Sequence, residues 1–136
     1  MSKQTLTNQE LVDLVNGLYA VKDLQGVKFA LVVSKNIENL QKELKHIDDA
    51  GKPTDEFIQI AEQVQALLKS GKEEEAKKLE EDNKQLTEER QKQIDELQVV
   101  LKEESTVNIY TIFSNQLPGD ITADQVMRIN KIIIEN

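Results

Sequence analysis

The sequence of 136 residues contains no cysteine, no tryptophan and a single histidine. The absence of cysteine excludes disulfides, thiolate metal sites and a cysteine nucleophile, and it is typical of a cytosolic protein. His46 has one carboxylate at a usable helical spacing, Asp49, and non-ligating residues one full turn away on either side. One histidine and one carboxylate are too few ligands for a tetrahedral zinc site. We therefore expect neither a metal nor any other cofactor.

Recognisable catalytic motifs are also absent. The sequence has no Gly-x-Ser-x-Gly turn, no phosphate-binding loop and no dinucleotide fingerprint. Acidic residues are abundant, but three runs of them lie on a stretch predicted to be a solvated helix: 73–75, 80–82 and 88–89. Solvated carboxylates are poor general acids near neutral pH. The sequence therefore indicates a protein that is not an enzyme.

Long hydrophobic runs and clustered cations are scarce. The longest apolar run, Phe29–Val33, and the run Ile132–Ile134 near the end of the sequence are far shorter than the roughly 20 residues that cross a bilayer. The N-terminus has no apolar signal core. The net charge is −8 with only two arginines, so binding along a nucleic-acid backbone, which requires clustered cations, is not expected. These features predict a soluble intracellular protein without a membrane segment.

Helix-forming residues dominate what the sequence does contain. The stretch from Ser70 to Glu104 is rich in Glu, Lys, Gln and Leu, and Ser70 with Glu73 has the spacing of a capping box. It predicts a continuous helix over 71–103, roughly 50 Å long. The heptad seam of this helix is weak, because three of its positions are polar: Asn83, Arg90 and Gln93. Such a helix needs a partner, either residues 27–50 folding back or a helix of another chain.

Four shorter helices are predicted from capping signals, among them capping boxes at Thr7–Glu10 and Thr122–Gln125, and from hydrophobic residues spaced three and four apart, such as Leu11, Leu14 and Leu18. We expect one from Thr7 to near Gly26, one from Val27 to 48–53, one over 54–69 and one from Ala123 to about Ile133. Residues 29–33 of the second are apolar on every side and are expected to be buried. Residues 1–6 are expected to be loose, and Leu117–Asp120 to form a type II turn.

One β-strand is predicted, over residues 106–113. Its sequence, TVNIYTIF, alternates in polarity and is rich in β-branched residues. A single strand leaves its backbone groups unpaired, so it needs a partner. The two candidates are residues 130–135 of the same chain and the same strand of a second subunit.

Together these elements predict a mainly α fold. We expect a long antiparallel helical hairpin or coiled-coil arm, a short β-strand and a small C-terminal helix, in an oligomeric protein. The chain is expected to form a single domain over 1–136, with a helical base at 7–50 and 106–136 and a helical arm at 54–104. Residues 70–104 carry 12 of the 25 acidic residues, so the rest is closer to neutral and could accept an anion.

Five residues of the base are candidates for binding a small anionic ligand. Lys28 and Lys35 lie seven residues apart on one side of an apolar helix, with Asn36 beside them. Arg128 could hold a phosphate or carboxylate through two nitrogens, and Tyr110 could stack on a base or ribose. Each kind of residue also has an explanation that involves no ligand. The lysines would extend over apolar stems to solvent, Arg128 would form a surface ion pair, and Tyr110 would belong to the core.

Segments at the two ends of the chain resemble a family of small uncharacterised helical proteins of tailed bacteriophages that infect Gram-positive hosts. They are LTNQELVDLVNGL, VKFALVVSKNIENLQKEL and VNIYTIFSNQLPGDITADQVMRINKIIIEN. The residues that carry the resemblance are the pair Lys35-Asn36 and the closing motif Leu117, Pro118, Asp120, Ile121 and Thr122. The middle of this chain differs from the family, because its arm is much longer.

The resemblance implies a phage protein without catalytic activity, in the cytoplasm of the infected bacterium. By analogy with small phage proteins that disarm host defence, one hypothesis is an oligomer that binds and sequesters a nucleotide-derived immune signal. Its contact residues would be Lys28, Lys35, Asn36, Tyr110 and Arg128. The other hypothesis is a coiled-coil assembly or scaffolding factor, or a factor that binds a host protein, whose interface is the arm.

Overall fold

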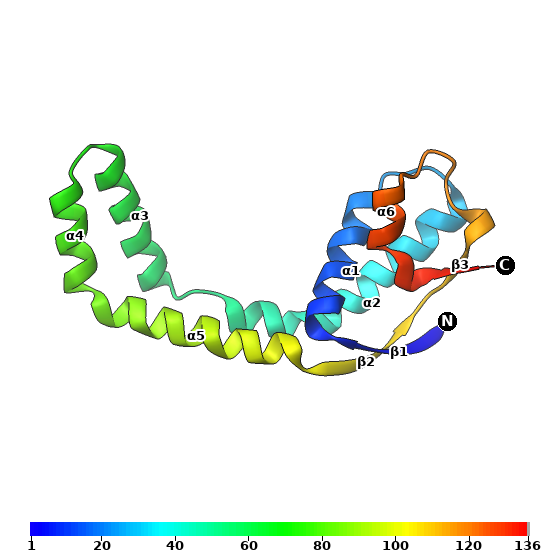
Figure 1. The fold of residues 1–136 in the computed structure, drawn as a ribbon, viewed down its shortest axis with the longest axis horizontal. Coiled ribbons are helices and arrows are strands. Elements are labelled where there is room, and N and C mark those ends of the chain that lie inside the picture. Colours follow the sequence, from blue (N-terminus) through cyan, green and yellow to red (C-terminus); the bar gives the residue numbers. More distant parts are fainter. Residues whose placement is uncertain (136) are drawn as a thin grey trace. The chain divides into compact units, whose positions relative to one another are not determined.

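The computed structural model describes residues 1–135 and is mainly helical, with six α-helices and four short strands among them (Figure 1). The helices are α1 (Asn8–Val21), α2 (Val27–Gly51), α3 (Asp55–Lys69), α4 (Glu73–Asp82), α5 (Lys84–Lys102) and α6 (Ala123–Arg128). The strands are β1 (Ser2–Thr7), β2 (Glu104–Ile109), β3 (Ile112–Phe113) and β4 (Ile133–Ile134).

The chain divides into two compact units. Unit 1 comprises Met1–His46 and the residues from Val100 onward, and unit 2 comprises Ile47–Val99. The last turn of α2 belongs to unit 2, whereas the rest of that helix belongs to unit 1.

The sheet of unit 1 begins with a strand that the sequence did not predict. Residues 2–7 form β1, which pairs antiparallel with β2 from Ser2↔Ile109 to Thr7↔Glu104. The expectation of a loose N-terminus is therefore wrong. Residues 2–7 are polar apart from Leu6, which is buried, and this composition hides a strand whose partner lies about 100 residues away in the sequence.

The predicted strand 106–113 is divided in two. β2 ends at Ile109, and β3 pairs in parallel with β4, Ile112 opposite Ile133 and Phe113 opposite Ile134. The proposed pairing with residues 130–135 is thus confirmed for the second part of the strand only. β1 supplies the partner for the first part, so the strand does not need a second subunit to pair.

Helix α1 starts at the capping box that the sequence predicts. The Thr7 hydroxyl accepts from the Glu10 backbone N–H at 3.1 Å, and the Glu10 carboxylate accepts from the Thr7 N–H at 3.0 Å. Its predicted apolar face, Leu11, Leu14 and Leu18, is buried. On another part of the same helix, Gly17 lies so close to α6 that a Cβ there would stand 2.7 Å from the Arg128 carbonyl oxygen.

Helix α2 begins after Gly26, whose φ of +130° favours glycine. Phe29 and Val33 are buried, but Val27 is 81% exposed and Leu31 is 53% exposed. The expectation that residues 29–33 are buried on every side is therefore wrong for Leu31. Unit 1 covers only one side of this helix.

The C-terminal elements follow their capping signals. Thr122 and Gln125 form the predicted capping box of α6. The helix ends at Arg128, earlier than the predicted Ile133, because a 3-10 turn at 130–132 leads into β4. The turn before α6 runs from Pro118 to Ile121, joined by a 3.3 Å hydrogen bond. Gly119 does not have the positive φ that the predicted type II turn requires.

In unit 2 the predicted continuous helix is broken. α4 and α5 are separated at Asn83, whose side-chain amide donates to the Leu79 carbonyl at 2.9 Å. The Ser70–Glu73 capping box does not form, because Gly71 reverses the chain with a φ of +75° and Lys72 takes the capping position without a side-chain hydrogen bond. α4 packs against α3, which is neither of the two predicted partners, whereas α5 contacts the end of α2, which belongs to the predicted partner 27–50.

The polar seam positions of α5 bind the end of α2. Arg90 donates to the Gly51 carbonyl at 2.8 Å, and Gln93 donates to the carbonyls of Ala50 and Lys52 at 2.8 and 2.9 Å. The last carbonyls of a helix lack intrahelical partners. Arg90 and Gln93 therefore serve as caps for α2, which is a sufficient reason for polar residues at these positions.

Candidate functional site

Three of the five predicted ligand residues lie together in unit 1. Asn36 is fully buried on α2, and its amide binds the backbone of Tyr110 twice, accepting from the N–H and donating to the carbonyl at 2.8 Å each. One turn further, Asn39 donates to the Asn108 carbonyl at 2.7 Å. These amides fix the end of β2 and the residue that follows it, and the Asn36 side chain is fully buried, so its evident role is to hold this segment in place.

Lys35 and Tyr110 share a shallow pocket of about 300 Å³. The Lys35 Nζ lies 5.4 Å from the centre of the Tyr110 ring, within cation–π distance. Glu38, Asn39 and Lys42 complete the lining. The pocket thus offers two cations and one carboxylate to an anion, but Lys35 already lies over one face of the ring on which a base would stack.

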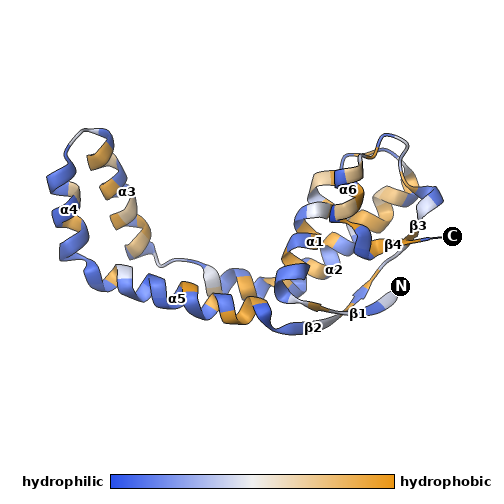
Figure 2. Ribbon diagram, viewed as in Figure 1, coloured by the Kyte–Doolittle hydropathy of each residue, from blue (hydrophilic) through white to orange (hydrophobic). Residues whose placement is uncertain are grey.

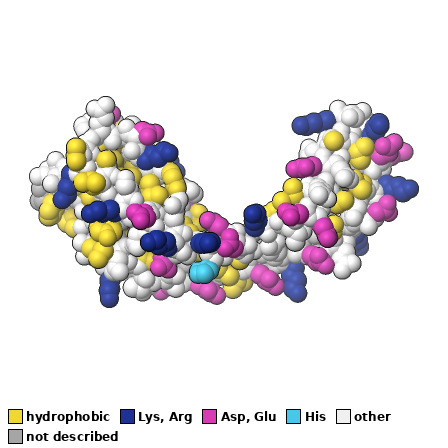
Figure 3. All heavy atoms as spheres, turned by 180° about the vertical axis from the view of Figure 1, so that it is seen from behind, with side chains coloured by type: hydrophobic (Ala, Val, Ile, Leu, Met, Phe, Trp, Pro, Cys, Tyr) yellow, Lys and Arg dark blue, Asp and Glu magenta, His cyan; other side chains and the backbone are white. Residues whose placement is uncertain are grey.

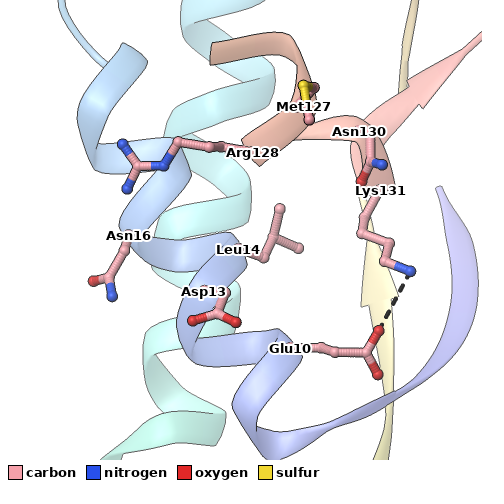
Figure 4. Close-up of a pocket in the computed structure, with 8 residues that line it drawn as sticks. All are labelled: Glu10, Asp13, Leu14, Asn16, Met127, Arg128, Asn130 and Lys131. Atoms are coloured by element: carbon pink, nitrogen blue, oxygen red, sulfur yellow. Dashed lines mark ion pairs between the residues drawn. The ribbon is translucent and has the colours of Figure 1, made fainter. Parts of the chain in front are cut away.

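The other two predicted residues are elsewhere. Lys28 is exposed and does not line this pocket. Arg128 lines a different pocket, of about 420 Å³, between α1 and the end of α6 with the residues that follow it (Figure 4). Within one chain, the five residues therefore do not form a single binding site.

The pocket at Arg128 contains charges of both signs. Lys131 forms an ion pair with Glu10 at 3.4 Å, while Arg128 extends on the other side of Leu14, toward Asn16 (Figure 4). The hydrogen bonds from the Thr7 backbone and side chain, aided by Lys131, lower the pKa of Glu10. Two cations are opposed by Glu10 and Asp13, so this pocket has no net preference for an anion.

A larger apolar groove lies in unit 2 and was not predicted as a site. It measures about 480 Å³ and lies between α3 and the α4–α5 junction. Its floor is the N-terminal half of the apolar stripe of α3, which consists of Phe57, Ile60, Ala61, Val64, Leu67 and Leu68. Its opposite wall is polar. The lining residues are Phe57, Ile60, Ala61, Val64, Gln65, Glu80, Glu81, Lys84 and Thr87.

The apolar stripe of α3 is poorly covered. Of the 19 hydrophobic residues buried among residues 1–135, 16 lie in unit 1 and only Ile47, Val64 and Ala76 lie in unit 2. Phe57 and Ile60 are half-exposed, and Leu68 is 44% exposed. Hydrophobic residues run along α3 while α4 and α5 are mostly hydrophilic (Figure 2), and apolar atoms reach the surface of unit 2 between charged ones (Figure 3).

A shortage of apolar residues in the sequence could have revealed this groove. The stripe of α3 has six members: Phe57, Ile60, Ala61, Val64, Leu67 and Leu68. The helix that follows offers only Ala76 and Leu79 to cover them. An amphipathic helix whose neighbour cannot cover its apolar face indicates a surface that another element covers.

Metal centres and membrane-spanning helices are both absent from residues 1–135. No group of three or more His, Cys, Asp or Glu side chains there could hold a metal ion, and no helix of this part is long and apolar enough to cross a membrane. Comparison with protein-family models, curated proteins and solved structures finds no match. The placement of the residues themselves therefore carries the functional proposal.

Proposed function

We propose that this chain is a non-enzymatic binding protein that acts by holding a helix of another polypeptide in the groove of unit 2. The observation that carries the proposal is the uncovered stripe of α3, with Val64 buried and Phe57, Ile60 and Leu68 left partly in solvent. Exposed apolar surface of this kind, rimmed by polar residues, is typical of protein–protein interaction sites.

The energetics of α3 favour an occupied groove. An isolated helix of 15 residues is marginal in water, and α4 contributes a single buried side chain, Ala76, to its packing. Burial of apolar surface contributes about 25 cal/mol per Å². A partner helix laid along the stripe would bury the half-exposed side chains, and helix-in-groove binding uses anchors at this three-four spacing.

The resemblance of the two end segments to phage proteins supports a biological setting for this activity. We propose an assembly factor or a host-protein-binding factor in the cytoplasm of an infected bacterium, in which unit 2 is the interaction arm. The family resemblance of Lys35-Asn36 and of the closing motif 117–122 supports the phage origin, and the groove supports binding rather than catalysis.

Site-specific photo-cross-linking tests the proposal. A photoreactive phenylalanine analogue replaces Ile60, which lines the groove, in cells that produce the chain in its native setting. The matched control carries the analogue at Gln59, which is exposed on the same helix and lines no part of the groove. We expect a discrete adduct from position 60 and not from 59. Equal labelling at both positions, or none at either, would refute a groove interface.

A second candidate function is sequestration of a nucleotide-derived signal. The specific observation in its favour is the pocket in which Lys35 lies over Tyr110 with Lys42 nearby. A phosphate between the two lysines and a base near the ring would use these groups. In an oligomer, Lys28 or Arg128 of a neighbouring copy would complete the site.

Thermal-shift measurements test this second candidate directly. Cyclic dinucleotides, cyclic trinucleotides and cyclic ADP-ribose isomers are added at tens of micromolar to the wild type and to a Lys35→Ala, Lys42→Ala double variant. A stabilisation by one of them that the double variant loses supports sequestration. If no compound shifts the wild-type melting temperature, sequestration by this pocket is excluded.

A further inference from the structure

We propose that the helix held by the groove of unit 2 is a basic amphipathic helix of a different protein, and not a second copy of this chain. This inference rests on the proposed function, because it names the chemistry of the occupant of the same groove. It is carried by three observations: the charge of unit 2, the acidic wall of the groove, and the composition of the chain's own helices.

Unit 2 holds nearly all of the chain's net charge. Residues 47–99 contain 15 acidic and 8 basic residues, so this unit alone carries −7 of the total of −8. The remainder of the chain contains 10 acidic and 9 basic residues. A summed charge of one sign attracts partners of the other sign and raises the rate at which they associate. The field around the groove therefore favours a cationic occupant.

The wall opposite the apolar floor is acidic. Glu80 and Glu81 line the groove from α4, and neither takes part in an ion pair within the part of the chain described. The one cation of the wall, Lys84, is paired with Glu88 at 3.7 Å. A helix lying on Phe57, Ile60 and Val64 would thus present one edge of its polar face to two unpaired carboxylates, and lysine or arginine fits that edge.

A second copy of the chain fits this groove poorly. Association through the same face would bring a second unit of charge −7 against the first, a repulsion that counterions screen only beyond about 8–10 Å at physiological salt. None of the described helices α1 to α6 has more basic than acidic residues, so the described part of the chain offers no basic amphipathic helix. The lysine pair of α4, Lys77-Lys78, lies between two acidic runs, Glu73–Glu75 and Glu80–Asp82.

The length of α3, along which the stripe runs, sets the size of the occupant. α3 has 15 residues, about four turns and roughly 22 Å. The matching partner is a helix of about four turns with apolar anchors at positions i, i+3 or i+4, and i+7, and with lysine or arginine along one edge of that face.

Two synthetic peptides of four turns provide the test. Both have the same leucine stripe, and the flanking positions are lysine in one and glutamate in the other. Binding to the full chain is followed by fluorescence anisotropy at two salt concentrations. We expect the basic peptide to bind at least tenfold more tightly than the acidic one, and the difference to shrink at the higher salt concentration.

Charge reversal at Glu80 and Glu81 tests whether these two carboxylates cause the preference for the basic peptide. The variant Glu80→Lys with Glu81→Lys should reduce the tenfold preference to about one or invert it. Cations near the C-terminus of α4 complement the helix dipole, so this variant should fold. The matched control, Asp95→Lys with Glu96→Lys, makes the same change in net charge on α5 outside the groove. It should keep most of the preference.

Each other outcome overturns the inference. Equal affinity for both peptides, or tighter binding of the acidic one, contradicts a cationic occupant even if the cross-link at position 60 is found. A cross-linked adduct of twice the 15.5 kDa chain mass, with a dimer in light scattering that Ile60→Asp abolishes, assigns the groove to a second copy. Absence of the cross-link and of binding by either peptide refutes the proposed function itself.

Discussion

Replacing Asn36 by alanine should destabilise unit 1 by considerably more than the same replacement one turn further along α2. The Asn36 side chain is fully buried and makes two hydrogen bonds of 2.8 Å with the Tyr110 backbone. A typical hydrogen bond contributes about 1 kcal/mol net, and a buried group left without its partner costs about 1–3 kcal/mol. Two backbone groups lose their partner in Asn36→Ala, so we expect a loss of about 2–5 kcal/mol.

Asn39 provides the matched control. It is on the same helix, is half-exposed and donates a single hydrogen bond, to the Asn108 carbonyl at 2.7 Å. Water can replace the lost amide at such a position, so Asn39→Ala should cost about 0.5–1.5 kcal/mol. The comparison removes the effect of replacing asparagine by alanine in a helix, because both variants share it.

The aromatic residues of the chain allow unit 1 to be followed by itself. The sequence has no tryptophan, and its two tyrosines, Tyr19 and Tyr110, both belong to unit 1. Urea unfolding monitored by tyrosine fluorescence therefore reports unit 1, whereas circular dichroism at 222 nm reports the helices of both units. If Asn36→Ala lowers the free energy of unfolding of unit 1 no more than Asn39→Ala does, the assigned role of Asn36 is wrong.

Two further predictions concern α1. Gly17→Ala should lower unit 1 stability by about 1–3 kcal/mol despite the helix propensity of alanine, because its Cβ would meet the Arg128 carbonyl oxygen at 2.7 Å. The matched control is Gly51→Ala, whose Cβ would meet only the flexible Leu97 side chain and which should lower the free energy of unfolding in urea much less. If both variants lose the same free energy of unfolding, the close approach of α1 to α6 is wrong. The lowered pKa of Glu10 gives stability that is present above the ordinary glutamate pKa and is lost as pH falls through the folded value. Glu10→Gln should flatten this acid dependence of the urea midpoint, and an unchanged profile would count against the capping carboxylate.

Sequence reasoning succeeded where the determining contacts are local. The capping boxes at Thr7 and Thr122 involve residues three apart, and both form as predicted. The box at Ser70 has the same spacing but fails, since the left-handed Gly71 places Lys72 at the start of α4. The capping-box spacing therefore predicts a helix start only where no residue between its two ends, such as Gly71, favours a turn.

Contacts between distant residues escaped sequence reasoning. β1 was missed because its pairing with β2 is decided by residues about 100 positions away, and its composition is polar. At the candidate sites, the sequence grouped five residues, of which the fold brings Lys35 and Tyr110 into one pocket, whereas the bonds of Asn36 to the Tyr110 backbone could not be foreseen from residues 74 positions apart. The groove on α3 was missed because it depends on what the neighbouring helix lacks.

The pairing of β1 with β2 also constrains how the protein is made. Ser2 lies opposite Ile109, so the first strand leaves the ribosome long before its partner exists. At translation speeds of about 5–20 residues per second, the delay is roughly 5–20 s. All of residues 47–99 are synthesised within that interval, so the hairpin of α3 and α4, whose contacts are close in sequence, can fold first. The N-terminal strand lacks its partner until residues 104–109 have been synthesised and have left the ribosome.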